Sequence, residues 1–153
     1  MKKGEMMRLT LVIITAAFFL ISSPVICDTI NWKPYDEGMR LARNQGKKTF
    51  LHFRTDWCRY CTQMDKETFS NPFVIKFLSD HFVAVKVDGD REQAVGKDYK
   101  VKGYPDNRFL DGKGEEVYGL PGFVEPQAFL FFLEYIQTDS YKTMDPMQYY
   151  KSR

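Results

Sequence analysis

The chain has 153 residues, which is enough for one domain with a short appendage. Its 22 Lys and Arg residues nearly balance its 20 Asp and Glu residues, so bulk charge gives no reason to expect nucleic-acid binding. The composition is 44% hydrophobic and 16% aromatic, which excludes a disordered chain and is sufficient for a packed core.

Residues 1–27 have the pattern of a secretory signal peptide. A basic start with Lys2, Lys3 and Arg8 precedes an apolar run and then a polar segment. Removal of this segment would leave 19 basic and 19 acidic residues and two of the three cysteines. An exported protein with three cysteines would have one that cannot pair, and removal of the segment that ends at Cys27 would resolve this.

Two alternatives for this segment remain open. Residues 9–27 are mostly apolar and just long enough to form an uncleaved membrane anchor, although a Ser-Ser-Pro stretch interrupts them. Cys27 is also a candidate for lipid attachment, but Ile26 stands before it, where a small residue is usual. All three interpretations place residues 28–153 outside the cytosol.

The rest of the chain alternates between helical and extended patterns. We expect strands over 49–53, 82–87, 108–110 and 115–118, and helices over 35–44, 58–67, 72–78, 92–99 and 126–136. Ser70 or Asn71 is the expected N-cap of the third helix, which begins with Pro72. Helices between the early strands predict a parallel pair, and the turn at 111–114 predicts an antiparallel hairpin.

These elements predict an α/β domain over 28–136 with a central mixed sheet and helices on both faces. The core is expected to hold most of the phenylalanines, namely Phe53, Phe69, Phe73, Phe77, Phe82, Phe109, Phe129 and Phe132. Residues 137–153 contain Tyr and Met among polar residues, and we expect them to form a tail that follows the surface or frays.

The segment Trp57–Cys61 carries the most specific functional signal. It places Cys58 and Cys61 after a strand and at the start of a helix. Backbone N–H groups at a helix N-terminus favour a thiolate, and Arg59 adds positive charge beside Cys58. We therefore expect Cys58 to be the exposed nucleophile, Cys61 the buried resolving thiol, and Trp57 a cover over the site.

The sequence gives less support to two other uses of these cysteines. A structural disulfide would close a loop too short to constrain the unfolded chain much. A zinc site needs four ligands, and only His52 and His81 remain beside the two thiols. We therefore expect no metal and no dissociable cofactor, because the dithiol itself carries the electrons.

The segment Asp56–Cys61, including Tyr60, resembles the active site of thioredoxin-fold proteins. Further segments occur in the order typical of one subgroup, the exported thioredoxin-like proteins similar to the C-terminal domain of DsbD-type disulfide reductases. The resemblance covers about residues 32–136 and includes Thr68–Val74, Val85–Asp88, Val101–Pro105, Phe109–Gly114 and Gly122–Phe123.

The resemblance implies roles for several further residues. The family's proline at the position of Pro105 is cis, and the preceding residue, here Tyr104, offers its backbone to the substrate. His52 stands where the family usually has a buried Asp that accepts the resolving thiol's proton. It could shuttle that proton or merely pack there, and Asp65 could assist or remain on the surface. The polar residues 106–108 depart from the family pattern and make the register of their strand uncertain.

The sequence thus predicts an exported thiol–disulfide oxidoreductase, and the resemblance implies that it reduces disulfides in exported proteins of the periplasm. The resemblance implies that a membrane or soluble thiol donor restores the dithiol. Two alternatives are an oxidase or isomerase with the same cysteines, and a module that only binds proteins through this fold.

Overall fold

The computed structural model describes residues 29–153. Segment 1–27 with Cys27, where a signal peptide, an anchor or a lipid site is expected, lies outside the described residues. Within 29–153 no helix is both long enough and apolar enough to cross a membrane.

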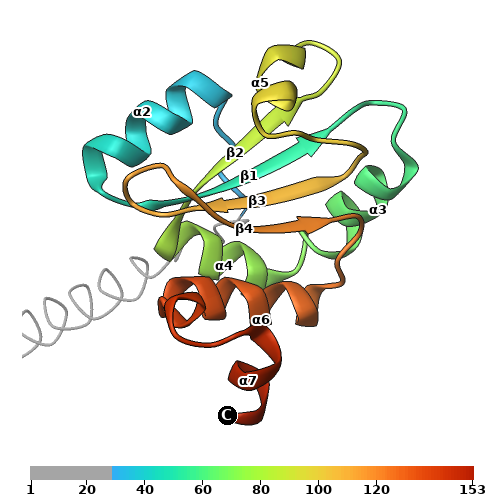
Figure 1. The fold of residues 1–153 in the computed structure, drawn as a ribbon. Helices are drawn as coiled ribbons and strands as arrows, with labels where there is room; N and C mark the ends of the chain where they lie inside the picture. The colour runs from blue at the N-terminus through green and yellow to red at the C-terminus, as the bar shows by residue number, and fades with distance from the viewer. Residues whose placement is uncertain (1–28) are drawn as a thin grey trace, which may run out of the picture.

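A four-stranded sheet forms the centre of the described domain (Figure 1). Its strands are β1 (Lys48–Arg54), β2 (Phe82–Asp88), β3 (Asp106–Leu110) and β4 (Glu116–Pro121), in the spatial order β2-β1-β3-β4. The pair β1–β2 is parallel, and β3 pairs antiparallel with both β1 and β4. This is the predicted mixed sheet.

Helices cover both faces of the sheet, as predicted (Figure 1). The helices are α2 (Tyr35–Gln45), α3 (Arg59–Glu67), α4 (Pro72–His81), α5 (Gln93–Asp98), α6 (Pro126–Gln137) and α7 (Pro146–Lys151), with a 3₁₀ turn at Ser140–Lys142. One face packs against α2, and the other packs against α4 and α6. An aromatic cluster of Phe50, Phe69, Phe109 and Phe129 fills this second face.

Local signals explain where the helices begin and end. The Asn71 side chain accepts hydrogen bonds from the N–H groups of Phe73 and Val74, at 3.0 and 3.3 Å, and thereby caps α4. At the C-terminal end of α2, Gly46 adopts a left-handed conformation with φ 61°, which a residue with a side chain would disfavour. The expected boundaries of α2 agree with the structure to within one residue, and α4 begins at Pro72 as expected but continues three residues further, to His81.

Two packing expectations need correction. Phe73 is 72% exposed, because the buried side of α4 is formed by Val74, Ile75 and Leu78 instead. Phe77 and Phe132 are only partly buried. Strand β3 also begins two residues earlier than expected, at Asp106, since its polar side chains find buried partners there.

Residues 138–153 fold back onto α6 instead of fraying. The hydroxyl of Tyr135 in α6 donates to the carbonyl of Met144 at 2.6 Å, and Tyr149 of α7 is buried against the Tyr135 ring. Asp145 and Gln148 form a reciprocal capping box that begins α7. The C-terminal segment is therefore part of the packed domain.

Candidate active site

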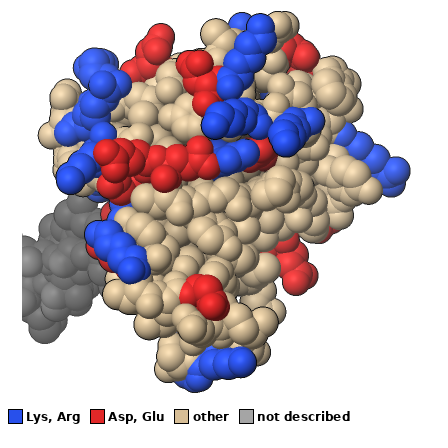
Figure 2. All heavy atoms as spheres, in the orientation of Figure 1, with Lys and Arg blue, Asp and Glu red and all other residues tan. Residues whose placement is uncertain are grey.

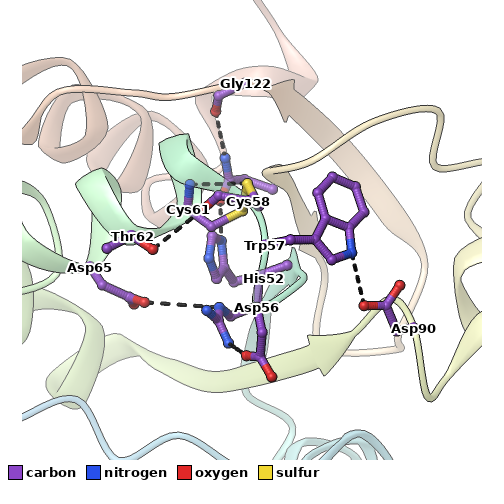
Figure 3. The surroundings of a disulfide bond; sticks show 11 residues. His52, Asp56, Trp57, Cys58, Cys61, Thr62, Asp65, Asp90 and Gly122 are labelled. Carbon is purple, nitrogen blue, oxygen red and sulfur yellow. Dashed lines mark hydrogen bonds and ion pairs between the residues drawn. A yellow bond between two sulfur atoms is a disulfide. The ribbon is translucent and has the colours of Figure 1, made fainter.

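A disulfide bond joins Cys58 and Cys61 at the start of α3 (Figure 3). Cys58 is the N-cap residue of this helix, and its sulfur accepts a hydrogen bond from the Cys61 N–H at 3.1 Å. Strand β1 ends only four residues earlier, so the sheet fixes the position of the helix N-terminus. The cysteines therefore lie where the sequence predicted, within the field of the unpaired N–H groups.

The two sulfur-bearing residues differ in access to solvent. Cys58 retains 5% of its surface and Cys61 retains none. Cys58 is thus more enclosed in the disulfide form than we expected, although the order of exposure is the expected one. Arg59 and Tyr60 follow it on the exposed side of α3, and Arg59 makes no ion pair within residues 29–153.

Trp57 stands at the rim of the site and is 71% exposed. Its indole N–H donates to Asp90 at 3.0 Å, and its ring meets the Tyr104 ring edge-on at a centroid distance of 6.0 Å (Figure 3). Gly89 lies directly behind Tyr104, where a Cβ would overlap the phenol ring. Trp57 therefore forms an exposed aromatic rim held in place by two neighbours.

A groove of about 460 Å³ runs beside Tyr104 and Pro105, which are joined by a cis peptide bond. Pro105 is buried, and its carbonyl accepts from the Gly122 N–H at 2.7 Å. Within residues 29–153 neither the N–H nor the C=O of Tyr104 makes a backbone hydrogen bond. These two groups remain available to another extended chain.

His52 lies on β1 and is completely buried (Figure 3). Its Nδ1 atom is 2.8 Å from Oδ1 of Asn107 on β3, and the two residues are direct cross-strand partners. Burial lowers the pKa of His52 from 6.5 to about 4, so the imidazole is neutral at physiological pH. Its Nε2 atom is buried and has no hydrogen-bond partner among the described residues.

Two charged residues that follow Pro105 form ion pairs with each other and with β4. Asp106 is buried and binds Arg108 through both carboxylate oxygens, and Arg108 also pairs with Glu116 on β4 at 2.6 Å. The β3 register is regular from Asp106 to Phe109, with an irregularity only at the next residue. No simple sequence signal reveals these partners, because Arg108 and Glu116 lie on different strands.

Asp65 lies one turn after Cys61 and takes part in an ion cluster. Its carboxylate is 3.0 Å from the Lys86 ammonium and 3.9 Å from the Arg54 guanidinium. The Lys86 ammonium also lies over the Trp32 ring, 4.6 Å from its centroid. The carboxylate is therefore shared between two cations. In the described part of the chain, no three His, Cys, Asp or Glu residues gather to hold a metal.

A Cys-x-x-Cys disulfide at this helix start, in this fold, defines the class of thiol–disulfide oxidoreductases. Residues 35–137 match the sequence model of the thioredoxin-like domain, and the chain belongs to that family.

The chain matches only part of the length of its curated relatives. The chain is 33% identical over 103 residues to the thiol:disulfide interchange protein DsbD of Escherichia coli, covering 63% of this chain and 18% of DsbD. It is 34% identical over 71 residues to the protein disulfide-isomerase erp38 of Neurospora crassa, covering 46% of this chain and 19% of erp38. The chain thus spans less than a fifth of either relative.

Solved structures place the fold in the same family. A thioredoxin from Thermus thermophilus superposes with a TM-score of 0.65 at 32% identity, covering 71% of this chain and 87% of that thioredoxin. The oxidised C-terminal domain of DsbD from Neisseria meningitidis gives a TM-score of 0.54 at 24% identity, covering 67% of this chain and 97% of that domain. The second likeness supports the fold alone.

Proposed function

We propose that the domain reduces disulfide bonds in exported proteins through the Cys58–Cys61 dithiol. The observation that carries this proposal is the pair's position at the N-terminus of α3, where Cys58 retains a small exposed surface and Cys61 retains none. The partial match to DsbD favours reduction over oxidation, and the basic and apolar pattern of residues 1–27 supports export. No dissociable cofactor is needed in this scheme.

In the reduced domain, Cys58 acts as a thiolate, which the N–H of Cys61 and the helix N-terminus stabilise. It attacks one sulfur of the substrate disulfide, and the other substrate sulfur leaves as a thiolate. Cys61 then loses its proton and attacks the Cys58 sulfur. This step closes the domain's disulfide and releases the second substrate thiolate, so two electrons pass to the substrate.

The groove beside Tyr104 and Pro105 is the proposed docking place for the substrate chain. The free N–H and C=O of Tyr104 can pair with a substrate strand, and this pairing would bring the substrate disulfide towards Cys58. Trp57 and Tyr60 would contact apolar parts of the substrate, because both rings are largely exposed. A membrane-bound or soluble thiol donor would restore the dithiol.

A trapping experiment tests the catalytic roles. The full chain with Cys61→Ala should accumulate mixed disulfides on Cys58 with exported proteins, and these should disappear on treatment with dithiothreitol. The double variant Cys58→Ala, Cys61→Ala is the matched control and should trap nothing. If Cys61→Ala traps no more than the control, or if Cys58→Ser retains full biological function, the domain acts as a binding module.

The direction of electron flow is tested separately. The pre-reduced full chain should reduce insulin, and its reduction potential should lie near that of thioredoxin, about −270 mV. A potential near about −120 mV, as in strong oxidases, would instead support the oxidase alternative. The intact mass of the protein isolated from cell envelopes should show loss of the targeting segment, and retention or lipidation at Cys27 would identify an anchored form.

A further inference from the structure

The segment just before the cis peptide bond lines the groove beside Tyr104 and has a free backbone. Within residues 29–153, Lys102, Gly103 and Tyr104 neither donate nor accept a backbone hydrogen bond. A Cβ on Gly103 would meet nothing within 4 Å, so the side of Gly103 on which a side chain would stand is open. Unpaired backbone groups at the surface are a template for another extended chain. Three consecutive residues are therefore available for pairing.

The groove carries an excess of positive charge. Three of its lining residues, Lys100, Lys102 and Arg108, are cations. Asp106 is the only carboxylate among the described residues that line it, and Arg108 binds both of its oxygens. Arg108 also pairs with Glu116, whereas the two lysines are exposed and form no ion pair within residues 29–153. Figure 2 shows Lys and Arg side chains gathered on the upper part of this face, around the segment that joins α5 to β3.

Other carboxylates near Tyr104 lie outside the groove. Gly89, which stands between Asp88 and Asp90, lies directly against the Tyr104 hydroxyl. Neither of these two acidic residues lines the groove, and the Asp90 carboxylate accepts the Trp57 N–H at 3.0 Å. The charge of the two groove lysines is therefore left for a partner from outside the described chain.

Lys100 has a backbone conformation that ordinarily selects glycine. Its φ is 54°, and it directly follows the C-cap residue of α5. Its N–H donates to the Lys97 carbonyl at 3.0 Å, and the Val101 N–H donates to the Gly96 carbonyl at 2.9 Å. These two bonds form a Schellman C-terminus, in which glycine is usual at this position. A lysine here costs stability, and such a local cost points to a functional use of the side chain.

We propose that Lys100 and Lys102 select substrate segments that carry acidic residues beside the disulfide cysteine. The extended segment pairs with the free backbone around Tyr104, and its carboxylates lie along the groove near the two ammonium groups. A lysine ammonium is a point charge on a flexible stem, so it accepts carboxylates at several positions and does not require one sequence. The inference rests on the proposed function, because the bound segment is the one that Cys58 reduces.

The test compares two short peptides with the pre-reduced full chain. The peptides differ only in the residues on either side of a single cysteine, which are Glu in one and Lys in the other. The cysteine is held in a mixed disulfide with neutral 2-mercaptoethanol. Reduction forms the Cys58–Cys61 disulfide and releases the peptide thiol and mercaptoethanol, so two electrons pass from the domain to the mixed disulfide.

The second-order rate constants of the two peptides give the preference. At about 0.1 M salt the Glu peptide should react about tenfold faster than the Lys peptide, because exposed charges attract the first and repel the second. At about 1 M salt the screening length falls to about 3 Å, and the two rate constants should agree to within about twofold. A preference that does not change with salt would contradict selection by charge.

Variants assign the preference to the two lysines. Lys102→Gln and Lys100→Gly should each lower the ratio of the rate constants about threefold, and the double variant should remove the preference. Lys113→Gln is the matched control, because it removes an exposed lysine from the turn at the far end of β3 and should keep the full ratio. The same two peptides are used throughout, so their intrinsic reactivities cancel between variants.

Lys100→Gly also tests the conformational argument through stability. Glycine adopts the left-handed conformation without cost, so the midpoint of thermal unfolding of the full chain should rise by roughly 1–4 °C while the preference falls. A lower midpoint than that of the unaltered chain would show that the Lys100 side chain supports the fold, and it would overturn the role assigned to this residue.

The outcomes separate this inference from the proposed function. If the unaltered chain reduces both peptides equally fast, or if the double variant keeps the preference, selection by the lysines is refuted and the proposed function stands. If the unaltered chain reduces neither peptide, the proposed function fails and the selection fails with it.

Discussion

Burial of the neutral His52 makes the free energy of unfolding of the domain depend on pH, and the size of this dependence follows from the pKa shift. Above pH 6.5 the imidazole of His52 is neutral in both the folded and the unfolded chain, and it adds nothing to the pH dependence. As the pH falls below 6.5, the unfolded chain binds a proton that the folded chain refuses until about pH 4. The free energy of unfolding therefore decreases with falling pH in this window.

The difference between the two pKa values sets the size of the effect. At 1.36 kcal/mol for each pKa unit, the full window from 6.5 to about 4 corresponds to about 3 kcal/mol. At pH 4.5 most of this, about 2.5 kcal/mol, should already be lost. That is a large part of the total stability of a domain of this size.

Urea denaturation of the oxidised full chain at pH 7.0 and pH 4.5 measures this loss. Carboxylates contribute at pH 4.5 in every variant, so the informative quantity is the difference between the unaltered chain and His52→Leu. The variant should lose about 2.5 kcal/mol less between the two pH values. Equal losses in the unaltered chain and His52→Leu would refute the argument.

Three further predictions concern packing, capping and the site. Phe129→Ala should lower the free energy of unfolding by about 3–5 kcal/mol because the ring is fully buried among other aromatics, whereas Phe73→Ala on the exposed side of α4 should change it by less than about 0.5 kcal/mol in the same urea titration. Asn71→Ala should cost about 1 kcal/mol through loss of the α4 cap, and an effect below about 0.3 kcal/mol would contradict the capping role. Gly89→Ala should displace the Tyr104 ring and slow insulin reduction at least several-fold, with little change in the redox equilibrium with glutathione. An unchanged rate would show that the position of Tyr104 does not matter.

Most of the fold could be predicted from local patterns. The strands and long helices have clear periodicity, and turn residues such as Gly46 and Asn71 mark their ends. The place of Cys58 and Cys61 followed from a motif whose chemistry requires a helix N-terminus. These features depend on residues that are close together in the sequence, so local patterns are sufficient to predict them.

The remaining features depend on partners distant in sequence. Asn107 is a polar residue in a central strand, and its hydrogen bonds to His52 and to the carbonyls of Leu120 and Gly122 explain why it can be buried there. Phe73 looks like a core residue, but its place in the first turn of α4 directs it to solvent. Pairing across strands and the orientation of a helix face are set by the whole domain, so no local pattern reveals them.

The exposed edge of the sheet has a consequence for association between copies of the protein. Strand β4 ends the sheet, and such an edge invites pairing with a strand of another chain. Pro121 lacks an N–H at one end, Glu116 places a charge at the other, and the register irregularity near Leu110 twists the hairpin. Figure 2 shows charged side chains concentrated on the upper half of this face, above a largely uncharged surface. Pro121 and Glu116 on β4 thus discourage edge-to-edge pairing with another copy of the protein.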